Sequence, residues 1–352
     1  MRCRAIDGLR GYAAASVIIF HAILHYNMDL WVTFFTSPID AYTRPDTWLF
    51  SLLISIFSGS TPVIIFFILS GYVLSVSLMN SNSGYFSFII KRIGRIYPSV
   101  IACTLLTSLI LDFINNSTSF TSINDIFNNI LLLDNKVLGV TWTLTIEMAF
   151  AFLVYPLCYL IKKFGPIVIF ISVIYSIIAI SKPSLTFNIP FMNVSLIFLI
   201  SGMALNTDIA KSVFKNTHRF IPAYLILIIS VGKFSQEWTP LFILIQALLC
   251  LPLVGALIYS DGGRIKSLLE NKTSTFIGEV SYSLYLFSVP VGFYFYAQFP
   301  YSGPYTVIFG LFSGLVITSL SLLLSSVTYR FIEKPSITAS KKASMLSFKK
   351  TS

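Results

Sequence analysis

Long runs of apolar residues recur along the whole chain and are separated by short polar segments. A helix of about 20 apolar residues crosses the ~30 Å hydrocarbon core of a bilayer. The pattern predicts ten such helices, of which 166–181 is the weakest. We place them at residues 9–28, 62–79, 97–114, 141–162, 166–181, 190–205, 219–233, 240–259, 281–299 and 305–329. The pattern therefore predicts an all-α, polytopic membrane protein.

Composition supports a chain without a soluble domain of its own. The 352 residues are 55% hydrophobic and 11% charged, with a mean hydropathy of +0.81, whereas soluble domains carry about 25% charged residues. We expect one membrane domain over residues 1–335 and a basic, disordered cytoplasmic tail over 336–352. The first apolar run carries Arg10 and His21 and lacks a small-residue cleavage site after it, so we expect a membrane helix rather than a signal peptide.

The net charge of +10 would suggest a nucleic-acid partner in a soluble protein. Here its distribution indicates membrane topology instead. If the N-terminus is cytoplasmic, only four of the 24 Lys and Arg residues fall in outer segments, namely Arg44, Lys136, Lys182 and Lys233. This bias predicts ten crossings with both termini in the cytoplasm. We expect membrane lipid as a partner and no nucleic acid, and the lysines of the tail would be attracted to anionic headgroups.

The first predicted helix carries two ionisable residues on one face. Ten residues separate Arg10 from His21, and the eleven helical steps bring them to nearly the same azimuth about 16 Å apart along the axis. Ionisable groups inside a bilayer are costly and indicate function. A neutral imidazole in a cavity is a usual general base, so we predict this role for His21. The alternative is a histidine that only packs.

Glu147 is the second buried ionisable residue. It lies about six residues into a helix that enters from the outer side, hence ~21 Å above the inner face, and His21 lies ~18 Å above it. We therefore expect the two side chains to face a common cavity, with the carboxylate orienting the imidazole. The alternative is a glutamate that an arginine or a helix end holds in place for packing.

A basic segment at residues 91–98 supplies two further arginines. Arg92 and Arg95 are three residues apart and share one side of a helix. Arginine binds phosphate oxygens in a forked geometry, so with Arg10 these residues predict a cytoplasmic site for a phosphorylated ligand. The alternative is ordinary anchoring at the membrane surface, which we prefer for Lys91.

Several other features narrow the chemistry. Ser70 and Gly71 suit close helix packing better than a nucleophile, and anchoring does not explain Glu333 near the end of the last span. The four cysteines are scattered, so we expect neither a disulfide framework nor a metal site. The chain also lacks a phosphate-binding glycine loop, a GxSxG elbow and a DxD-like pair. Metal catalysis and nucleotide hydrolysis therefore lose support.

These motifs together resemble the acyltransferase-3 family of bacterial membrane O-acyltransferases. Arg10 and His21 match the Arg-X10-His signature of that family, and Trp142 and Glu147 lie in a segment similar to its Trp–Glu motif. The resemblance extends over residues 6–335, through segments 66–72, 91–98, 141–147, 281–286 and 329–335. The chain has Ser288 where family members often carry a histidine, and Ala151 where an aromatic residue often follows the Trp–Glu motif.

The resemblance implies transfer of an acyl group, most often acetyl, from acyl-coenzyme A to a hydroxyl of a cell-surface glycan, at the bacterial inner membrane. The acceptor would be lipid-linked or polymeric, such as an O-antigen or exopolysaccharide unit. Acetyl-CoA would be a donor substrate, with no bound cofactor and no metal. We expect Arg10, Arg92 and Arg95 to hold the coenzyme A phosphates. His21 would be a general base or a transient acyl carrier that Glu147 orients. The supporting residues would be Ser70, Trp142 and Glu333.

Two other functions fit the same residues. A proton-coupled transporter could use His21 and Glu147 as a relay and the arginines as a substrate gate. A non-catalytic subunit of a glycan-assembly complex would need neither a proton relay nor a substrate gate.

Overall fold

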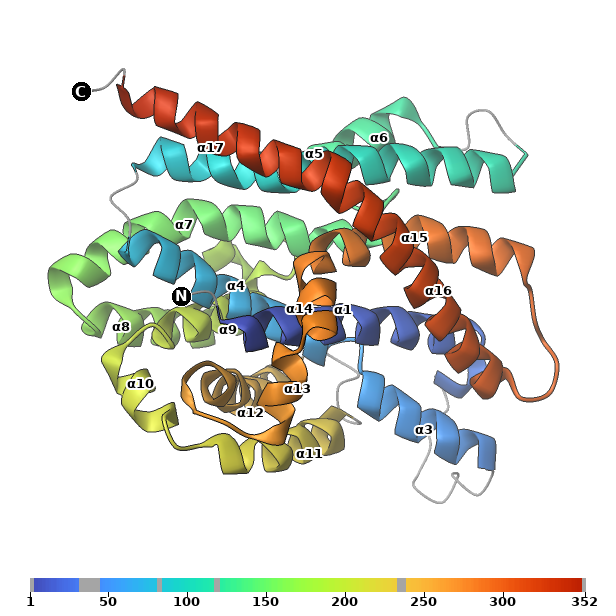
Figure 1. Ribbon diagram of the computed structural model, residues 1–352, viewed down its shortest axis with the longest axis horizontal. Helices are drawn as coiled ribbons and strands as arrows, with labels where there is room; N and C mark the ends of the chain where they lie inside the picture. The colour runs from blue at the N-terminus through green and yellow to red at the C-terminus, as the bar shows by residue number, and fades with distance from the viewer. Residues whose placement is uncertain (1–2, 32–44, 81–83, 117–120, 233–238, 350–352) are drawn as a thin grey trace.

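The computed structural model describes residues 3–31, 45–80, 84–116, 121–232 and 239–349, and over these ranges its regular elements are all helical. Figure 1 shows their arrangement. The helices, in chain order, are α1 (Arg4–His25), α3 (Pro45–Phe57), α4 (Thr61–Met79), α5 (Tyr85–Ile114), α6 (Ile123–Ile130), α7 (Trp142–Phe164), α8 (Ile167–Ile180), α9 (Met192–Ala204), α10 (Asp208–Phe214), α11 (Ile221–Gly232), α12 (Pro240–Tyr259), α13 (Arg264–Glu270), α14 (Lys272–Glu279), α15 (Ser281–Gln298), α16 (Thr306–Thr328) and α17 (Lys334–Lys349).

Each of the ten predicted segments overlaps a helix, which confirms the all-helical class. Within the described ranges, six helices are long and apolar enough to cross a membrane, or eight if α9 with α10 and α14 with α15 each count as one bent span. The helices α8 and α11 are shorter, and 14 residues rise only ~21 Å. The structure therefore supports six to eight crossings, and the figure of ten stays a prediction.

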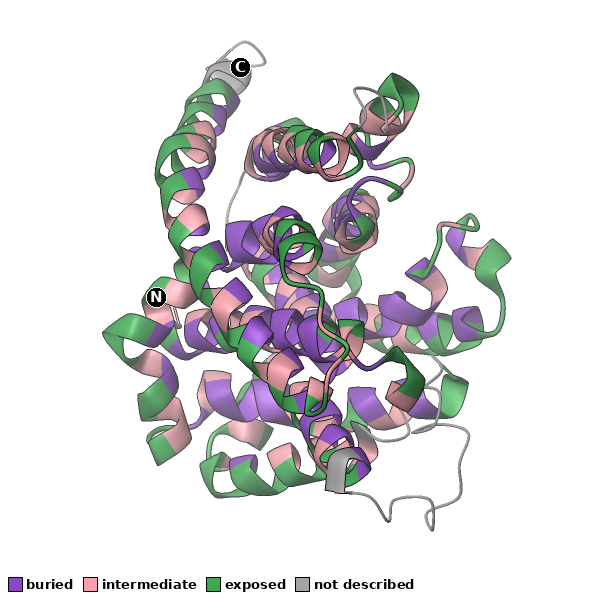
Figure 2. Ribbon diagram, turned by 90° about the vertical axis from the view of Figure 1, so that its right-hand side faces the viewer, coloured by how far each residue is buried: buried purple, intermediate pink, exposed green. Residues whose placement is uncertain are grey.

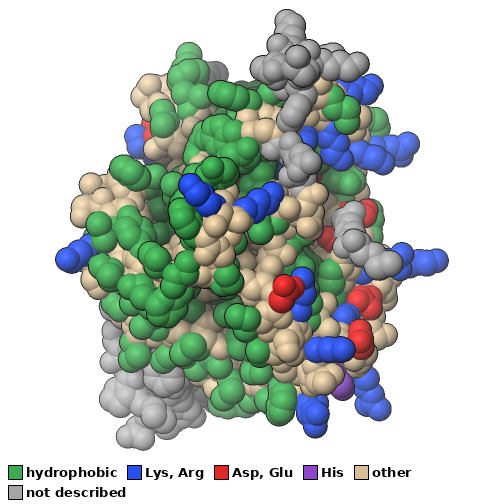
Figure 3. Space-filling view, turned by 90° about the vertical axis from the view of Figure 1, so that its left-hand side faces the viewer, with side chains coloured by type: hydrophobic (Ala, Val, Ile, Leu, Met, Phe, Trp, Pro, Cys, Tyr) green, Lys and Arg blue, Asp and Glu red, His purple; other side chains and the backbone are tan. Residues whose placement is uncertain are grey.

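The exterior is apolar over wide areas. Figure 3 shows one face on which apolar side chains predominate and basic side chains gather toward one side. On α8, for example, Phe170 and Ile171 are exposed. Because soluble proteins rarely leave large contiguous apolar patches uncovered, this exterior is consistent with a surface that lipid surrounds.

The helix α1 lies at the centre of the bundle, where buried residues are concentrated (Figure 2). It packs against α4, α14, α15 and α16. Glycines permit the close approach: a Cβ atom on Gly278 of α14 would lie 1.8 Å from the carbonyl oxygen of Asp7. On the opposite helix, a Cβ on Gly314 of α16 would lie 2.9 Å from the Cα of Ile19. These contacts fix the rotation of α1 and therefore the direction of its polar side chains.

The helices α4 and α9 cross closely through a second pair of glycines. A Cβ on Gly71 would lie 2.0 Å from the carbonyl oxygen of Leu199, and one on Gly202 would lie 2.0 Å from that of Ile68. The prediction that Ser70 and Gly71 permit close helix approach is thus confirmed for Gly71. Ser70 is left to face the interior of the bundle.

The C-terminal segment differs from the sequence-based expectation. Residues 336–352 were expected to be disordered, but α17 continues as a helix to Lys349, and residues 350–352 lie outside the described ranges. It packs along α5 (Figure 1), where Ser340 contacts Gly94. The prediction failed because the segment is polar overall. Ser340 and Ser344 are nevertheless buried, at helical spacing from the buried Glu333 that precedes the segment. These residues form a narrow buried face along one side of the helix.

Candidate functional site

The three predicted arginines line one cavity, which we call the arginine cavity. Its volume is about 70 Å³. Arg10 comes from α1, and Arg92 and Arg95 come from α5. Ser70 of α4 and Glu147 of α7 complete its polar lining together with residues of α15. Five helices thus bring together three cationic groups and one carboxylate.

Glu147 is bound on two sides inside the arginine cavity. Arg92 donates a hydrogen bond to its Oε1 in an ion pair, and the Ser70 hydroxyl donates to the same oxygen at 3.0 Å. The side chains of Arg92 and Glu147 are 9% and 26% exposed. Buried charges are stable only when they are paired and hydrogen-bonded. The contact therefore joins α4, α5 and α7 and sets the direction of both groups.

The expectation that Glu147 and His21 face one cavity was wrong. The carboxylate binds Arg92 and Ser70, whereas His21 lines a separate, adjoining cavity. The depth estimate placed the residues at similar heights, but height does not determine on which side of its helix a residue lies. A buried carboxylate takes the strongest available partner, and here this is the guanidinium on α5.

His21 lies in a larger cavity of about 610 Å³, which we call the histidine cavity. The imidazole is solvent-accessible although it lies in the central helix, because it projects into this space. Aromatic rings form much of the wall, including Trp142 and Phe293. His25 stacks on Tyr296 with ring centroids 3.9 Å apart and an angle of 12° between the planes. The cavity thus combines one accessible imidazole with several flat apolar surfaces.

The supporting residues take different places. Trp142 lines the histidine cavity, and its ring packs against Phe67 and Phe191. Glu333 is 2% exposed and accepts a hydrogen bond of 2.7 Å from the Ser283 hydroxyl. It ends a π-helical segment, Tyr329–Glu333, and such segments often occur at functional sites. This contact ties the segment that follows α16 to α15. It gives the buried Glu333 carboxylate a structural role, which anchoring at the membrane surface does not.

Two tyrosines of α15 also line the cavities and were not predicted from the sequence. Tyr282 lines the arginine cavity, and its hydroxyl donates a hydrogen bond of 2.8 Å to the Ile96 carbonyl oxygen of α5. Tyr285 lines both cavities. Residues three apart lie on one face of a helix. The spacing of three residues between Tyr282 and Tyr285, within the segment 281–286, is the sequence feature that could have indicated a shared role.

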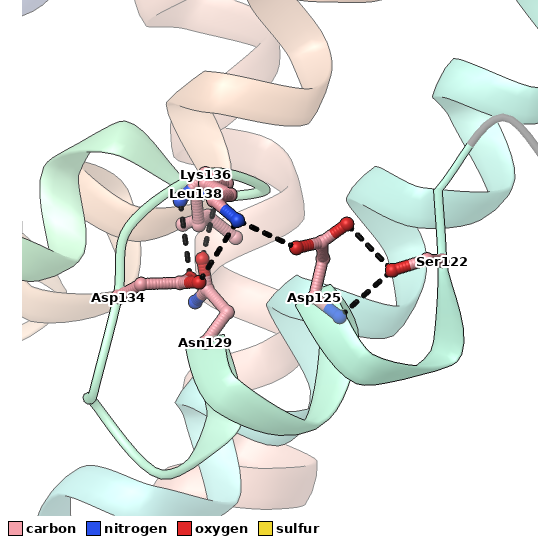
Figure 4. Close-up of polar contacts among 6 residues, drawn as sticks. All are labelled: Ser122, Asp125, Asn129, Asp134, Lys136 and Leu138. Carbon is pink, nitrogen blue, oxygen red and sulfur yellow. Dashed lines mark hydrogen bonds and ion pairs between the residues drawn. The ribbon is translucent and has the colours of Figure 1, made fainter.

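A polar network on the surface fixes the segment that leads into α7 (Figure 4). Lys136 forms an ion pair of 3.1 Å with Asp125, whose helix Ser122 caps. The hydrogen bond from Ser122 and the pairing with Lys136 lower the pKa of the Asp125 carboxyl. Asn129 accepts a hydrogen bond of 2.8 Å from the Leu138 backbone N–H. These contacts hold the turn that precedes Trp142 at the wall of the histidine cavity.

Comparison with known proteins assigns the chain to a family. The acyltransferase domain family Acyl_transf_3 matches residues 4–328. The O-acetyl transferase of Shigella phage Sf6 is 30% identical over 118 residues. That similarity covers 34% of this chain and 29% of the phage protein, so it spans less than a third of the relative's length. No solved structure is detectably similar. The family match takes in α1 to α16 with both cavities, and the chain accordingly belongs to this acyltransferase family.

Proposed function

We propose that the protein is a membrane O-acyltransferase that moves an acetyl group from acetyl-coenzyme A to a hydroxyl of a cell-surface glycan. One observation carries the proposal. Three guanidinium groups line a cavity that adjoins a second cavity with an accessible imidazole. The first arrangement suits an anionic donor, and the second suits activation of a hydroxyl. The name of the phage relative supports acetyl as the group transferred.

The donor would bind through its phosphates at the arginine cavity. Arg10 and Arg95 are partly accessible, whereas Arg92 is buried and pairs with Glu147. The Nε atom of Arg92 is buried and has no hydrogen-bond partner among the described residues. Buried donors without partners are rare in folded proteins, and a phosphate oxygen would satisfy this one. Acetyl-CoA is a substrate here and leaves as coenzyme A.

The transfer itself requires one proton to move twice. In the direct route, His21 takes the proton from the acceptor hydroxyl while the hydroxyl oxygen forms a bond to the thioester carbonyl carbon. The carbon–sulfur bond then breaks, and His21 returns the proton to the thiolate. In the covalent route, the imidazole first takes the acetyl group from sulfur, and the sulfur leaves as the coenzyme A thiolate. The acetyl group then passes from the imidazole to the hydroxyl oxygen, and the hydroxyl proton goes to that thiolate. Trapping an acetylated His21 after mixing with donor alone would distinguish the routes.

The histidine cavity would hold the acceptor. Its volume lies in the range typical of small-ligand sites, about 300–1,000 Å³. Aromatic rings such as Trp142 and Phe293 offer flat faces that pack against the C–H faces of sugar rings. The acceptor is therefore a glycan unit, either lipid-linked or polymeric, such as an O-antigen or exopolysaccharide repeat.

The topology we propose places the arginine end of α1 at the cytoplasmic face of a bacterial inner membrane, with both termini inside. The distribution of basic residues supports this orientation. Of the four basic residues assigned to outer segments, Lys136 and Lys182 lie in described turns, whereas Arg44 and Lys233 lie outside the described residues. A ten-crossing arrangement would require the short helices α8 and α11 to cross together with their flanking turns.

Analysis of the surface glycan in cells with and without this protein tests the proposal. Mass spectrometry should show that the glycan loses one acetyl group per modified unit when the gene is deleted, and NMR should identify the esterified hydroxyl. Complementation with the wild-type chain should restore the group, and complementation with His21→Ala should not. Acetylation that His21→Ala restores in full would instead favour transport or a non-catalytic role.

A further inference from the structure

We infer that the side chain of Tyr285 is the closed barrier between the arginine cavity and the histidine cavity. It is the place where the acyl arm of the donor must pass. The first statement concerns the geometry alone, and the second rests on the proposed function. The two cavities share lining residues, yet Glu147 lies in one and His21 in the other. A donor held by the arginines therefore reaches the imidazole only through the common wall.

One face of α15 runs along both cavities. Tyr282 lines the arginine cavity, and Ser288 lines the histidine cavity. Tyr285 lies between them at a spacing of three residues in each direction, and it lines both. Residues at this spacing follow one side of a helix. The boundary between the cavities therefore falls at the Tyr285 ring.

Residues of two other helices also lie at the boundary between the cavities. Val63 of α4 also lines both cavities. On α7 the boundary falls between neighbours, since Trp142 lines the histidine cavity and Thr143 the arginine cavity. Val63 and Tyr285 are 5% and 8% exposed, so they are packed tightly at the boundary.

Packing against apolar neighbours holds the Tyr285 ring in the closed position. The ring belongs to a cluster of buried apolar residues that includes Val63 and Leu69. The Phe66 ring lies at 6.0 Å between centroids, tilted by 55°. These neighbours are side chains, so rotation of the Tyr285 ring against this packing is the step that opens the passage.

Labelling a cysteine in the histidine cavity from each side of the membrane tests the barrier without any need for catalysis. The reporter is Ser288→Cys in a Cys3→Ser background, since Cys103, Cys158 and Cys250 are buried. Sealed vesicles of both orientations are treated with 2-sulfonatoethyl methanethiosulfonate, a small impermeant anion that the arginines attract. With Tyr285 present, we expect labelling only from the side of the membrane opposite the arginine cavity. Tyr285→Ala should raise the rate from the other side about tenfold or more.

Two variants act as checks. Val63→Ala removes part of the wall from α4 and should also open the second route, which keeps the test valid if Tyr285→Ala fails to fold. Tyr294→Ala is the matched control, because Tyr294 lies on the same helix and is 47% exposed. It should leave labelling one-sided. Two-sided labelling with Tyr285 in place, or one-sided labelling in both wall variants, would overturn the inference.

Acetyl transfer from acetyl-CoA is measured on vesicles of the wild-type protein in parallel. Absence of that activity would contradict the proposed function and leave the result on the barrier standing. Activity together with an unchanged labelling pattern in the wall variants would contradict the barrier alone.

Discussion

Arg92 and Glu147 make the most constrained contact of the site. The pair is largely removed from water, and Glu147 receives a second hydrogen bond from Ser70. Removing one partner of a buried pair leaves a charge that nothing compensates, which costs about 3–5 kcal/mol. Because Glu147 is 26% exposed, the cost here falls at the lower end of that range. The pair therefore contributes to stability as well as to the position of Arg92.

Separating these two contributions gives the first prediction. Glu147→Gln should lower the free energy of unfolding by about 3 kcal/mol because the Arg92 charge loses its partner. The double variant Arg92→Met with Glu147→Leu should recover much of that stability, since apolar pairs often replace buried ion pairs without loss. Thermal unfolding in detergent measures both. Recovered stability with normal acetyl-CoA affinity would contradict the role of Arg92 in donor binding.

Ser70 allows a milder test. Ser70→Ala removes a hydrogen bond to a charged acceptor, a contact worth about 1.5–3 kcal/mol, while the Arg92 pair remains. Because Ser70 is only partly buried, we expect a loss of stability at the lower end of that range and a reduced but measurable transfer rate. The matched control is Ser319→Ala, whose exposed hydroxyl donates to the Leu315 carbonyl oxygen in its own helix. A nucleophilic role of Ser70 would instead abolish transfer completely.

The elements that place these residues depend on glycine at close crossings. A Cβ on Gly278 would lie 1.8 Å from the carbonyl oxygen of Asp7, so Gly278→Ala must push α14 away from α1. Overpacking of this kind costs about 1–3 kcal/mol. Gly139→Ala is a suitable control, because a Cβ there meets nothing within 4 Å. Equal melting temperatures for the two variants would contradict the packing described for α1.

The network on the surface gives a pH-dependent prediction. The pKa of Asp125 is lower in the folded protein than its ordinary value. Its contribution to stability is therefore present above the ordinary carboxylate pKa and is lost as the pH falls through the lowered value. Hydrogen exchange in residues 131–141 should accelerate over that acidic range in the wild type. Asp125→Asn should show fast exchange already at neutral pH, and slow exchange in this variant would contradict the role of the ion pair.

The positions of the helices could be predicted from the length of apolar runs, since every predicted segment overlaps one. The short helices α10, α13 and α14 were not predicted, because they lie where polar residues interrupt the pattern. The sequence placed Arg92 and Arg95 on one side of a helix, and the structure brings both to the cavity that Arg10 also lines. The sequence left the partner of Glu147 open between His21 and an arginine, because the partner depends on how α7 is rotated against α5. Tyr285 was not predicted for a similar reason, because a residue between two cavities can be recognised only when the positions of both cavities are known.

At the scale of the whole molecule, orientation in the membrane is the property with the most consequences. The proposed topology puts Lys136 outside and the exposed Lys341 of α17 inside. Single cysteines at these positions, in a Cys3→Ser background, should react with an impermeant thiol reagent from opposite sides of sealed vesicles. Reaction of both from one side would contradict the topology and the direction of donor entry.

Transfer of radiolabelled acetyl from acetyl-CoA to purified glycan acceptor, by protein reconstituted in bilayers, tests the joint use of the two cavities. The wild-type protein should label the acceptor. His21→Asn should still bind acetyl-CoA with nearly wild-type affinity, because the arginine cavity is intact, but should transfer no label. Arg10→Ala should bind the donor weakly and transfer slowly. Labelling of the acceptor by His21→Asn at the wild-type rate would contradict the proposed mechanism.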